Sequence, residues 1–150
     1  MIYADHAATT KISETAKLAM LSAMEKDWYN PSSLYTPGQQ ASGTLMDARV
    51  RIAHCLGCMP KEIYFTSGGS EADNQAILSA AAIGKRQGKM HIISTAFEHH
   101  AVLHTLKKLE KEGFEITLLD VGEKGIVSPA QVEKAIRPDT ALVTVMYANN

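Results

Sequence analysis

With 150 residues, 45% of them hydrophobic and 21% charged, the chain has the size and composition of one globular domain. Fifteen basic and sixteen acidic side chains give a formal net charge of -1, which argues against a nucleic-acid-binding or polybasic membrane-binding protein. No segment approaches about 18 continuous apolar residues, and the N-terminus lacks the pattern of a signal peptide. We therefore expect a cytoplasmic protein whose partners are small molecules or another protein chain.

The first third of the chain is predicted to contain only helices and loops. Apolar residues recur at helical spacing from Ser13, the expected N-cap, to Lys26. A second helix is predicted from Pro37 to about Leu56, with Gly57 as its C′ cap. Residues 1–58 thus form a mainly helical N-terminal segment.

The rest of the chain, residues 59–150, alternates between two kinds of segment. Short apolar runs predict strands at 62–65, 90–94, 114–119 and 141–146, and helical patterns separate them at 71–86, 100–112 and 128–137. Gly113 is expected to end the second of these helices. This alternation predicts an α/β fold in which helices sandwich a mostly parallel sheet, with right-handed crossovers.

A glycine- and serine-rich turn, FTSGGSEADN (residues 65–74), follows the first predicted strand. Glycines at such a turn let backbone N–H groups approach an anion closely, and the following helix directs its positive end to the same point. A phosphate suits this place, although the turn matches neither the dinucleotide fingerprint nor the P-loop. The alternative is that Ser67 and Ser70 only cap the helix and the glycines only turn the chain.

Polar residues also follow the second and fourth predicted strands. His100 and His104 are spaced for a metal, but no further ligand completes a set, and we expect no metal site. His99 could instead lie against an aromatic ring beside the phosphate pocket. Asn149 and Asn150 offer uncharged donors and acceptors for a hydroxyl on such a ring, with a simple turn as the alternative.

Cys55 and Cys58 form an isolated C-x-x-C pair, which allows a redox or zinc interpretation. Cys55 falls on the apolar face of the second predicted helix, and no other Cys or His pair stands at zinc-finger spacing. We therefore expect a buried, structural role for these cysteines.

Taken together, the motifs resemble the N-terminal part of the cysteine desulfurases, pyridoxal-phosphate (PLP) enzymes of fold type I related to the class V aminotransferases. The resemblance is collinear over essentially the whole chain, which makes residues 1–150 the N-terminal part of the family's large, PLP-binding domain. Five ordered segments carry it: IYADHAATT (2–10), NPSS (30–33), EIYFTSGGSEADN (62–74), EHHAVL (98–103) and MYANN (146–150).

The resemblance implies a role for four positions. By similarity, Gly69 and Ser70 bind the cofactor phosphate, His99 stacks on the pyridine ring and takes part in catalysis, and Asn150 bonds the 3-hydroxyl side of the ring. The implied reaction converts L-cysteine to L-alanine and transfers sulfur to an enzyme cysteine as a persulfide. The sulfur then passes to an acceptor protein for iron–sulfur clusters or thiolation, and the full-length enzyme is expected to be a homodimer.

Several of the family's functional residues have no match in this sequence. The cofactor lysine belongs to a Ser-x-His-Lys segment, and no lysine here directly follows a histidine. The partner aspartate, the substrate-binding arginine and the sulfur-accepting cysteine also belong to later parts of the family pattern. We therefore expect a fragment that is inactive alone. The alternatives are a selenocysteine lyase or another class V enzyme, and a non-catalytic binding module if the chain ends at residue 150.

Overall fold

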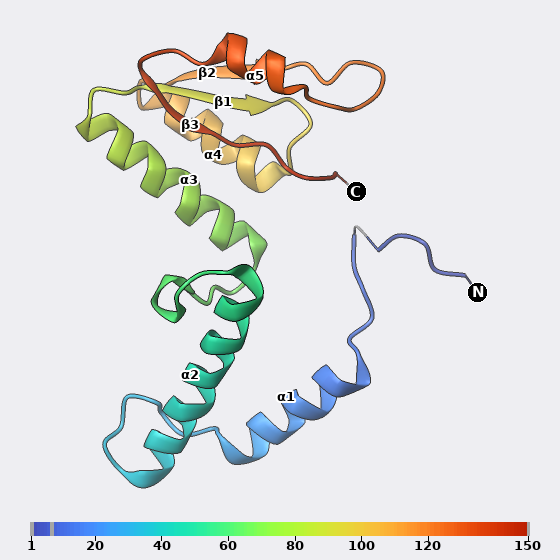
Figure 1. Ribbon diagram of the computed structural model, residues 1–150, viewed down its shortest axis with the longest axis vertical. Coiled ribbons are helices and arrows are strands. Elements are labelled where there is room, and N and C mark those ends of the chain that lie inside the picture. The colour runs from blue at the N-terminus through green and yellow to red at the C-terminus, as the bar shows by residue number, and fades with distance from the viewer. Residues whose placement is uncertain (1, 7, 150) are drawn as a thin grey trace. The chain divides into compact units, whose positions relative to one another are not determined.

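The computed structural model describes residues 2–6 and 8–149 (Figure 1). Contacts divide the chain into two compact units, Met1–Phe65 and Thr66–Asn150, and each is described by itself. Among the described helices, none is both long and apolar enough to cross a membrane.

Unit 1, which comprises residues 1–65, contains the two predicted helices. Helix α1 (Glu14–Lys26) begins as expected, because the Ser13 side chain accepts a hydrogen bond from the Ala16 amide at 3.2 Å. Helix α2 (Thr36–Leu56) ends at Gly57, whose left-handed conformation (φ 67°) caps the helix. Both predicted helix boundaries are thus confirmed to within a residue.

The predicted strand at residues 62–65 is wrong. A short 3-10 helix, η1 (Pro60–Glu62), occupies its start; Ile63 is extended, and residues 63–65 belong to no strand. Arg49 explains part of this: its Nε donates to the Ile63 carbonyl at 3.3 Å, and its guanidinium lies 5.1 Å from the centre of the Phe65 ring. An apolar run becomes a strand only where a neighbouring strand pairs with it, and none of the described residues of this unit forms such a strand.

Unit 2, residues 66–150, confirms the predicted alternation of helices and strands. Its elements in chain order are α3 (Gly69–Arg86), β1 (His91–Thr95), α4 (His100–Lys111), β2 (Glu115–Leu119), α5 (Pro129–Ala135) and β3 (Thr140–Val143). The strands form a parallel sheet in the order β2-β1-β3, so β1 lies in the middle. Gly113, which was predicted to end the helix before β2, follows α4 and has a left-handed conformation (φ 97°).

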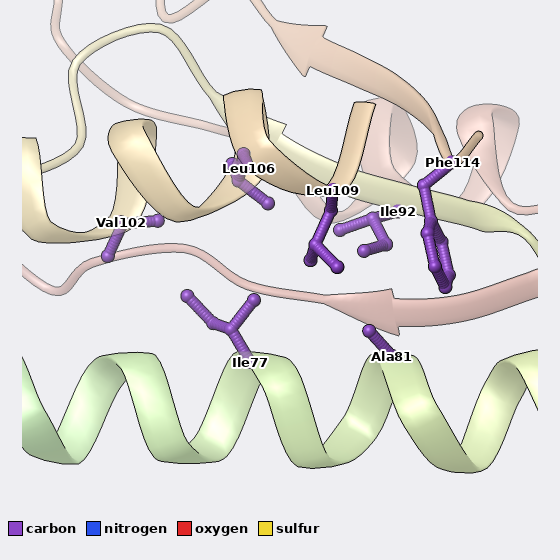
Figure 2. Close-up of a cluster of buried hydrophobic side chains, with 7 residues drawn as sticks. All are labelled: Ile77, Ala81, Ile92, Val102, Leu106, Leu109 and Phe114. Atoms are coloured by element: carbon purple, nitrogen blue, oxygen red, sulfur yellow. The ribbon is translucent and has the colours of Figure 1, made fainter. Parts of the chain in front are cut away.

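Helices cover both sides of this sheet, which confirms the predicted α/β sandwich. In Figure 1, α3 and α4 lie on one side of the strands and α5 lies on the other. The core fills the space between β1 and the α3–α4 pair (Figure 2). It consists of seven buried apolar side chains: Ile77, Ala81, Ile92, Val102, Leu106, Leu109 and Phe114.

On β1 the side chain of His91 is fully buried and joins all three strands. Its Nδ1 lies 2.8 Å from the Thr140 hydroxyl of β3, and its Nε2 lies 2.8 Å from the Thr117 hydroxyl of β2. Burial lowers the pKa of the His91 imidazole, and the positive charge of Arg137 lowers it further. The imidazole is therefore neutral in the fold at neutral pH.

This histidine makes stability depend on pH. The unfolded chain takes up a proton at His91 near pH 6.5, whereas the folded chain does so only at lower pH. The contribution of the neutral ring is therefore complete above about pH 6.5 and is lost as pH falls through the folded pKa, with a slope of at most about 1.4 kcal/mol per pH unit. Urea unfolding between pH 7.5 and 5 will show this slope, which His91→Gln will flatten.

The exposed His104 on α4 provides the matched control for this measurement. His104→Gln should leave the pH dependence of unfolding as it is in the parent protein. If the pH dependence of the unfolding free energy is unchanged in His91→Gln, it is caused by other groups.

Candidate functional site

The glycine- and serine-rich turn leads directly into α3 with Gly68 as the N-cap residue, and no side chain caps the helix. Ser67 instead bonds to the first turn, since its amide and its hydroxyl both donate to Glu71 Oε2 at 2.6 Å. Thr66 Oγ1 donates to the Gly68 carbonyl at 3.1 Å. The alternative in which Ser67 and Ser70 cap the helix is therefore not what the structure shows.

Neither glycine of this turn is required by its own surroundings. Gly68 is extended (φ 165°, ψ 179°), a conformation open to any residue, and Gly69 begins α3. Apart from the adjoining residues and the backbone of α3 itself, a Cβ at either position would meet no atom of the described chain within 4 Å. What glycine does provide is close access to the backbone N–H groups of the first helical turn, which have no carbonyl partner within the helix.

The carboxylate of Glu71 lies close to this open helix end. Hydrogen bonds from the Ser67 hydroxyl and amide hold the pKa of the Glu71 carboxyl below its ordinary value, so it is ionised at neutral pH. The amides of Gly69 and Ser70 lie in the first turn of α3, where backbone N–H groups have no carbonyl partner within the helix.

His99 is the N-cap of α4, and its ring is oriented by the cap. The Ala101 amide donates to His99 Nδ1 at 3.1 Å, so Nδ1 is an acceptor and, in the neutral ring, the proton lies on Nε2. The residue is exposed. Within the described part of the chain, His99 Nε2 has no hydrogen-bond partner, so this exposed side chain can donate to a ligand.

Ser70 and His99 line the same open hollow, which has a volume of about 480 Å³. Its other polar linings come from α3 and α4: Asn74, His100, His104, Thr105 and Lys108. Asn74 joins the two helices, because its Nδ2 donates to the Ser70 carbonyl at 2.6 Å and its Oδ1 accepts from the buried Thr105 hydroxyl. The structure thus brings the predicted phosphate-binding turn and the predicted ring-stacking histidine together.

A second set of hydrogen bonds joins the loop after β1 to the segment after β3. Glu98, only 4% exposed, accepts at Oε1 from the Thr95 hydroxyl (2.9 Å) and from the Met146 amide (2.8 Å). The Asn149 side-chain amide donates to the Phe97 carbonyl. Asn149 is therefore bonded to a distant loop and does not act only in a local turn. Asn150, the predicted ring-hydroxyl ligand, lies outside the described residues.

Sequence reasoning missed three contributors to this site: Asn74, Glu98 and Thr105. Asn74 and Glu98 belong to the two motifs that contain the candidate residues, and their side chains form hydrogen bonds that link separate parts of the site. The only cue in the sequence was the polar character of these residues, which follow a strand or interrupt the apolar face of a helix. The partner of each one is distant in the chain, which no local pattern indicates.

The predicted burial of Cys55 is wrong: the residue is exposed, and Cys58 is half-buried. The apolar face of α2 that carries Cys55 is itself largely uncovered in unit 1, with Val50, Ile52 and Leu56 exposed. In the described ranges 2–6 and 8–149, no three His, Cys, Asp or Glu side chains lie close enough to hold a metal ion. The His100 and His104 rings lie 5.8 Å apart, without a third ligand.

The parallel sheet, with the Ser70 and His99 hollow at the starts of α3 and α4, defines an α/β domain. Comparison with known families makes this specific, because the family model of the class V aminotransferases matches residues 2–150. The chain belongs to the class V aminotransferase family.

Individual relatives agree with this assignment. A Bacillus subtilis (strain 168) protein that carries a cysteine desulfurase name is 50% identical over 149 residues, which are 99% of this chain and 39% of that protein. The cysteine desulfurase IscS of Methanosarcina thermophila is 46% identical over 99% of this chain and 37% of its own length. The chain thus spans about two fifths of the length of these curated relatives.

Solved structures show the same fold. A NifS-like protein matches with a TM-score of 0.90 and 34% identity over 97% of this chain and 40% of its own. SspA in complex with cysteine matches with a TM-score of 0.85 and 38% identity over 94% of this chain and 40% of its own. The described residues therefore have the fold of the N-terminal part of NifS-like proteins.

Proposed function

We propose that the chain forms the N-terminal part of the PLP-binding domain of a cysteine desulfurase. The observation that carries this proposal is the pair of glycines Gly68 and Gly69 at the start of α3. The described residues give no conformational or steric reason for them, and they adjoin Ser70, which lines a hollow together with His99. The cysteine desulfurase names of the relatives support this reaction over that of a selenocysteine lyase.

The donor set fits a phosphorylated pyridine. The open N–H groups at the start of α3 suit a phosphate, with Gly69 permitting close approach and the Ser70 hydroxyl adding a donor. His99 offers a flat ring to lie against an aromatic ligand. When bound, PLP would supply an electron-withdrawing ring for chemistry at the substrate's α-carbon.

In this proposal His99 also transfers protons during the reaction. Because Nδ1 is fixed by the Ala101 amide, any proton that His99 gives or takes moves at Nε2. Asn150 is proposed to bond the 3-hydroxyl side of the ring, at the end of the segment that Asn149 ties to the Phe97 carbonyl.

The proposal extends to the substrate and partners of the whole enzyme. L-Cysteine is the proposed substrate, in line with the cysteine bound to the similar protein SspA, and the products are L-alanine and a persulfide passed to an acceptor protein. A homodimer is the proposed assembly. These 150 residues by themselves are proposed to be inactive, since no lysine follows a histidine and neither Cys55 nor Cys58 matches the sulfur-accepting position.

The phosphate-binding role is tested by titrating PLP into the protein and its Gly69→Val, Ser70→Ala double variant. We expect the variant to bind PLP at least about tenfold more weakly, which corresponds to a loss of about 1.4 kcal/mol in binding free energy. The valine side chain blocks the close approach of the phosphate to the backbone, and the alanine removes a hydroxyl donor. Inorganic phosphate should compete for the same site in the parent protein.

Ser79→Ala on the exposed side of α3 is the matched control and should bind PLP as the parent does. Equal affinity of the double variant and the parent, or a parent that binds no PLP, would contradict the proposal.

A further inference from the structure

Glu98 is a buried carboxylate that forms no ion pair within residues 2–6 and 8–149. A buried charge is unfavourable unless hydrogen bonds satisfy it. Here both hydrogen bonds, from the Thr95 hydroxyl and the Met146 amide, end on one oxygen, Oε1. The carboxylate therefore serves as a single acceptor for two donors from different parts of the sheet.

The two donors come from the ends of adjacent strands. Thr95 is the last residue of β1, and Met146 lies beyond the end of β3. Glu98 itself directly precedes His99, the cap of α4. A hydrogen bond from the Asn149 side chain to the Phe97 carbonyl makes a second link between the same two segments. Loss of the Glu98 carboxylate would leave a buried hydroxyl and a backbone amide without an acceptor.

We propose that Glu98 is a positioning residue that fixes the His99 loop (residues 96–99) against the segment at residues 144–149. Its bonds hold the His99 loop against the segment that carries Asn149. This proposal rests on the proposed function in one respect only: it names PLP as the ligand that binds between the His99 loop and the segment at residues 144–149. The coupling of the two segments is a property of the chain itself.

The acceptor geometry makes three variants informative. Glu98→Gln keeps an oxygen at the Oε1 position, so both donors can stay bonded without the charge. Glu98→Asp keeps the charge but is one methylene shorter and does not reach both donors. Glu98→Ala removes the acceptor altogether. Positioning by geometry therefore predicts that Gln preserves the arrangement and that Asp and Ala do not.

Amide hydrogen exchange of the protein without PLP tests the coupling directly. The Met146 amide reports the bond to Glu98, and the Ala101 amide reports the bond to His99 Nδ1. Glu98→Asp and Glu98→Ala should speed exchange of both amides about tenfold or more, whereas Glu98→Gln should change it less than about threefold. Glu110→Ala, an exposed change on α4, is the control and should leave both amides protected.

The same variants are then titrated with PLP. Weakening by about tenfold or more in Glu98→Asp and Glu98→Ala, with Glu98→Gln close to the parent, is the expected result. A parent that binds no PLP would overturn the proposed function while the exchange result still decides the positioning role.

Two outcomes would overturn the positioning role. One is unchanged protection of Ala101 when Met146 is released, which would show that the bond does not reach the His99 loop. The other is a Glu98→Gln variant as perturbed as Glu98→Ala, which would assign the effect to the charge. If Glu98→Ala does not fold, the Gln and Asp pair supplies the same comparison.

Discussion

Replacing Ile92 by Ala is expected to lower the free energy of unfolding by about 2–5 kcal/mol, the range found when a large buried side chain is truncated in a close-packed core. Ile92 is fully buried on β1, the central strand, and belongs to the same core cluster as Ile77 and Leu106 from the two covering helices (Figure 2). Because helices and strands surround the site, the cavity cannot collapse easily. Urea or thermal unfolding of the protein measures the change.

Ile126, which is 66% exposed, supplies the control for the Ile92 variant. Ile126→Ala removes the same atoms from a surface loop and should change the free energy of unfolding by no more than about 0.5 kcal/mol. If the two variants were equally stable, the cluster around Ile92 would not be the core of this unit.

Replacing Gly84 by Ala is expected to destabilise the protein by about 1–3 kcal/mol, although alanine favours helices by about 1 kcal/mol over glycine. A Cβ at Gly84 on α3 would lie 2.4 Å from the Ala141 Cβ on β3 and 3.1 Å from the Lys89 carbonyl oxygen. Neither neighbour is a flexible side chain that can move away, so α3 must shift from the sheet. Chemical unfolding of the single variant measures the loss.

Two further variants isolate the cause of this effect. Gly43→Ala in α2 has no atom near the added Cβ, so it should stabilise the protein by up to about 1 kcal/mol. Ala141→Gly combined with Gly84→Ala removes the clashing methyl group and should recover much of the stability. A double variant no better than Gly84→Ala alone would show that contact with Ala141 is not the cause.

Helices and the central strand were predictable because local signals specify them. Ser13 and Gly57 mark helix ends through their own backbone and side-chain chemistry, and the structure follows them. The apolar run at 90–94 became β1 because neighbours exist on both of its sides. The run at 62–65 has the same pattern but no strand beside it among residues 2–6 and 8–65, and it is not a strand. Pairing is a non-local property that the run itself cannot encode.

In the candidate site, too, local signals made some residues predictable, while others depend on contacts that are distant in the chain. The turn at 66–70 was predictable as an open helix end, and His99 was predictable as the residue after a strand. The roles of Glu98 and Asn74 were not predictable, because each bonds to a residue far away in the chain. The exposure of Cys55 was missed for the same reason, since amphipathic spacing in α2 does not say whether another element covers that face.

The strand order β2-β1-β3 constrains how this unit assembles on the ribosome. β1 and β2, joined through α4, can pair as soon as residue 119 has left the exit tunnel, but the other edge of β1 stays open until residues 140–143 emerge. The His91 ring then gains its second threonine only at that last step. The middle strand is therefore the first one made and the last one fully enclosed during synthesis.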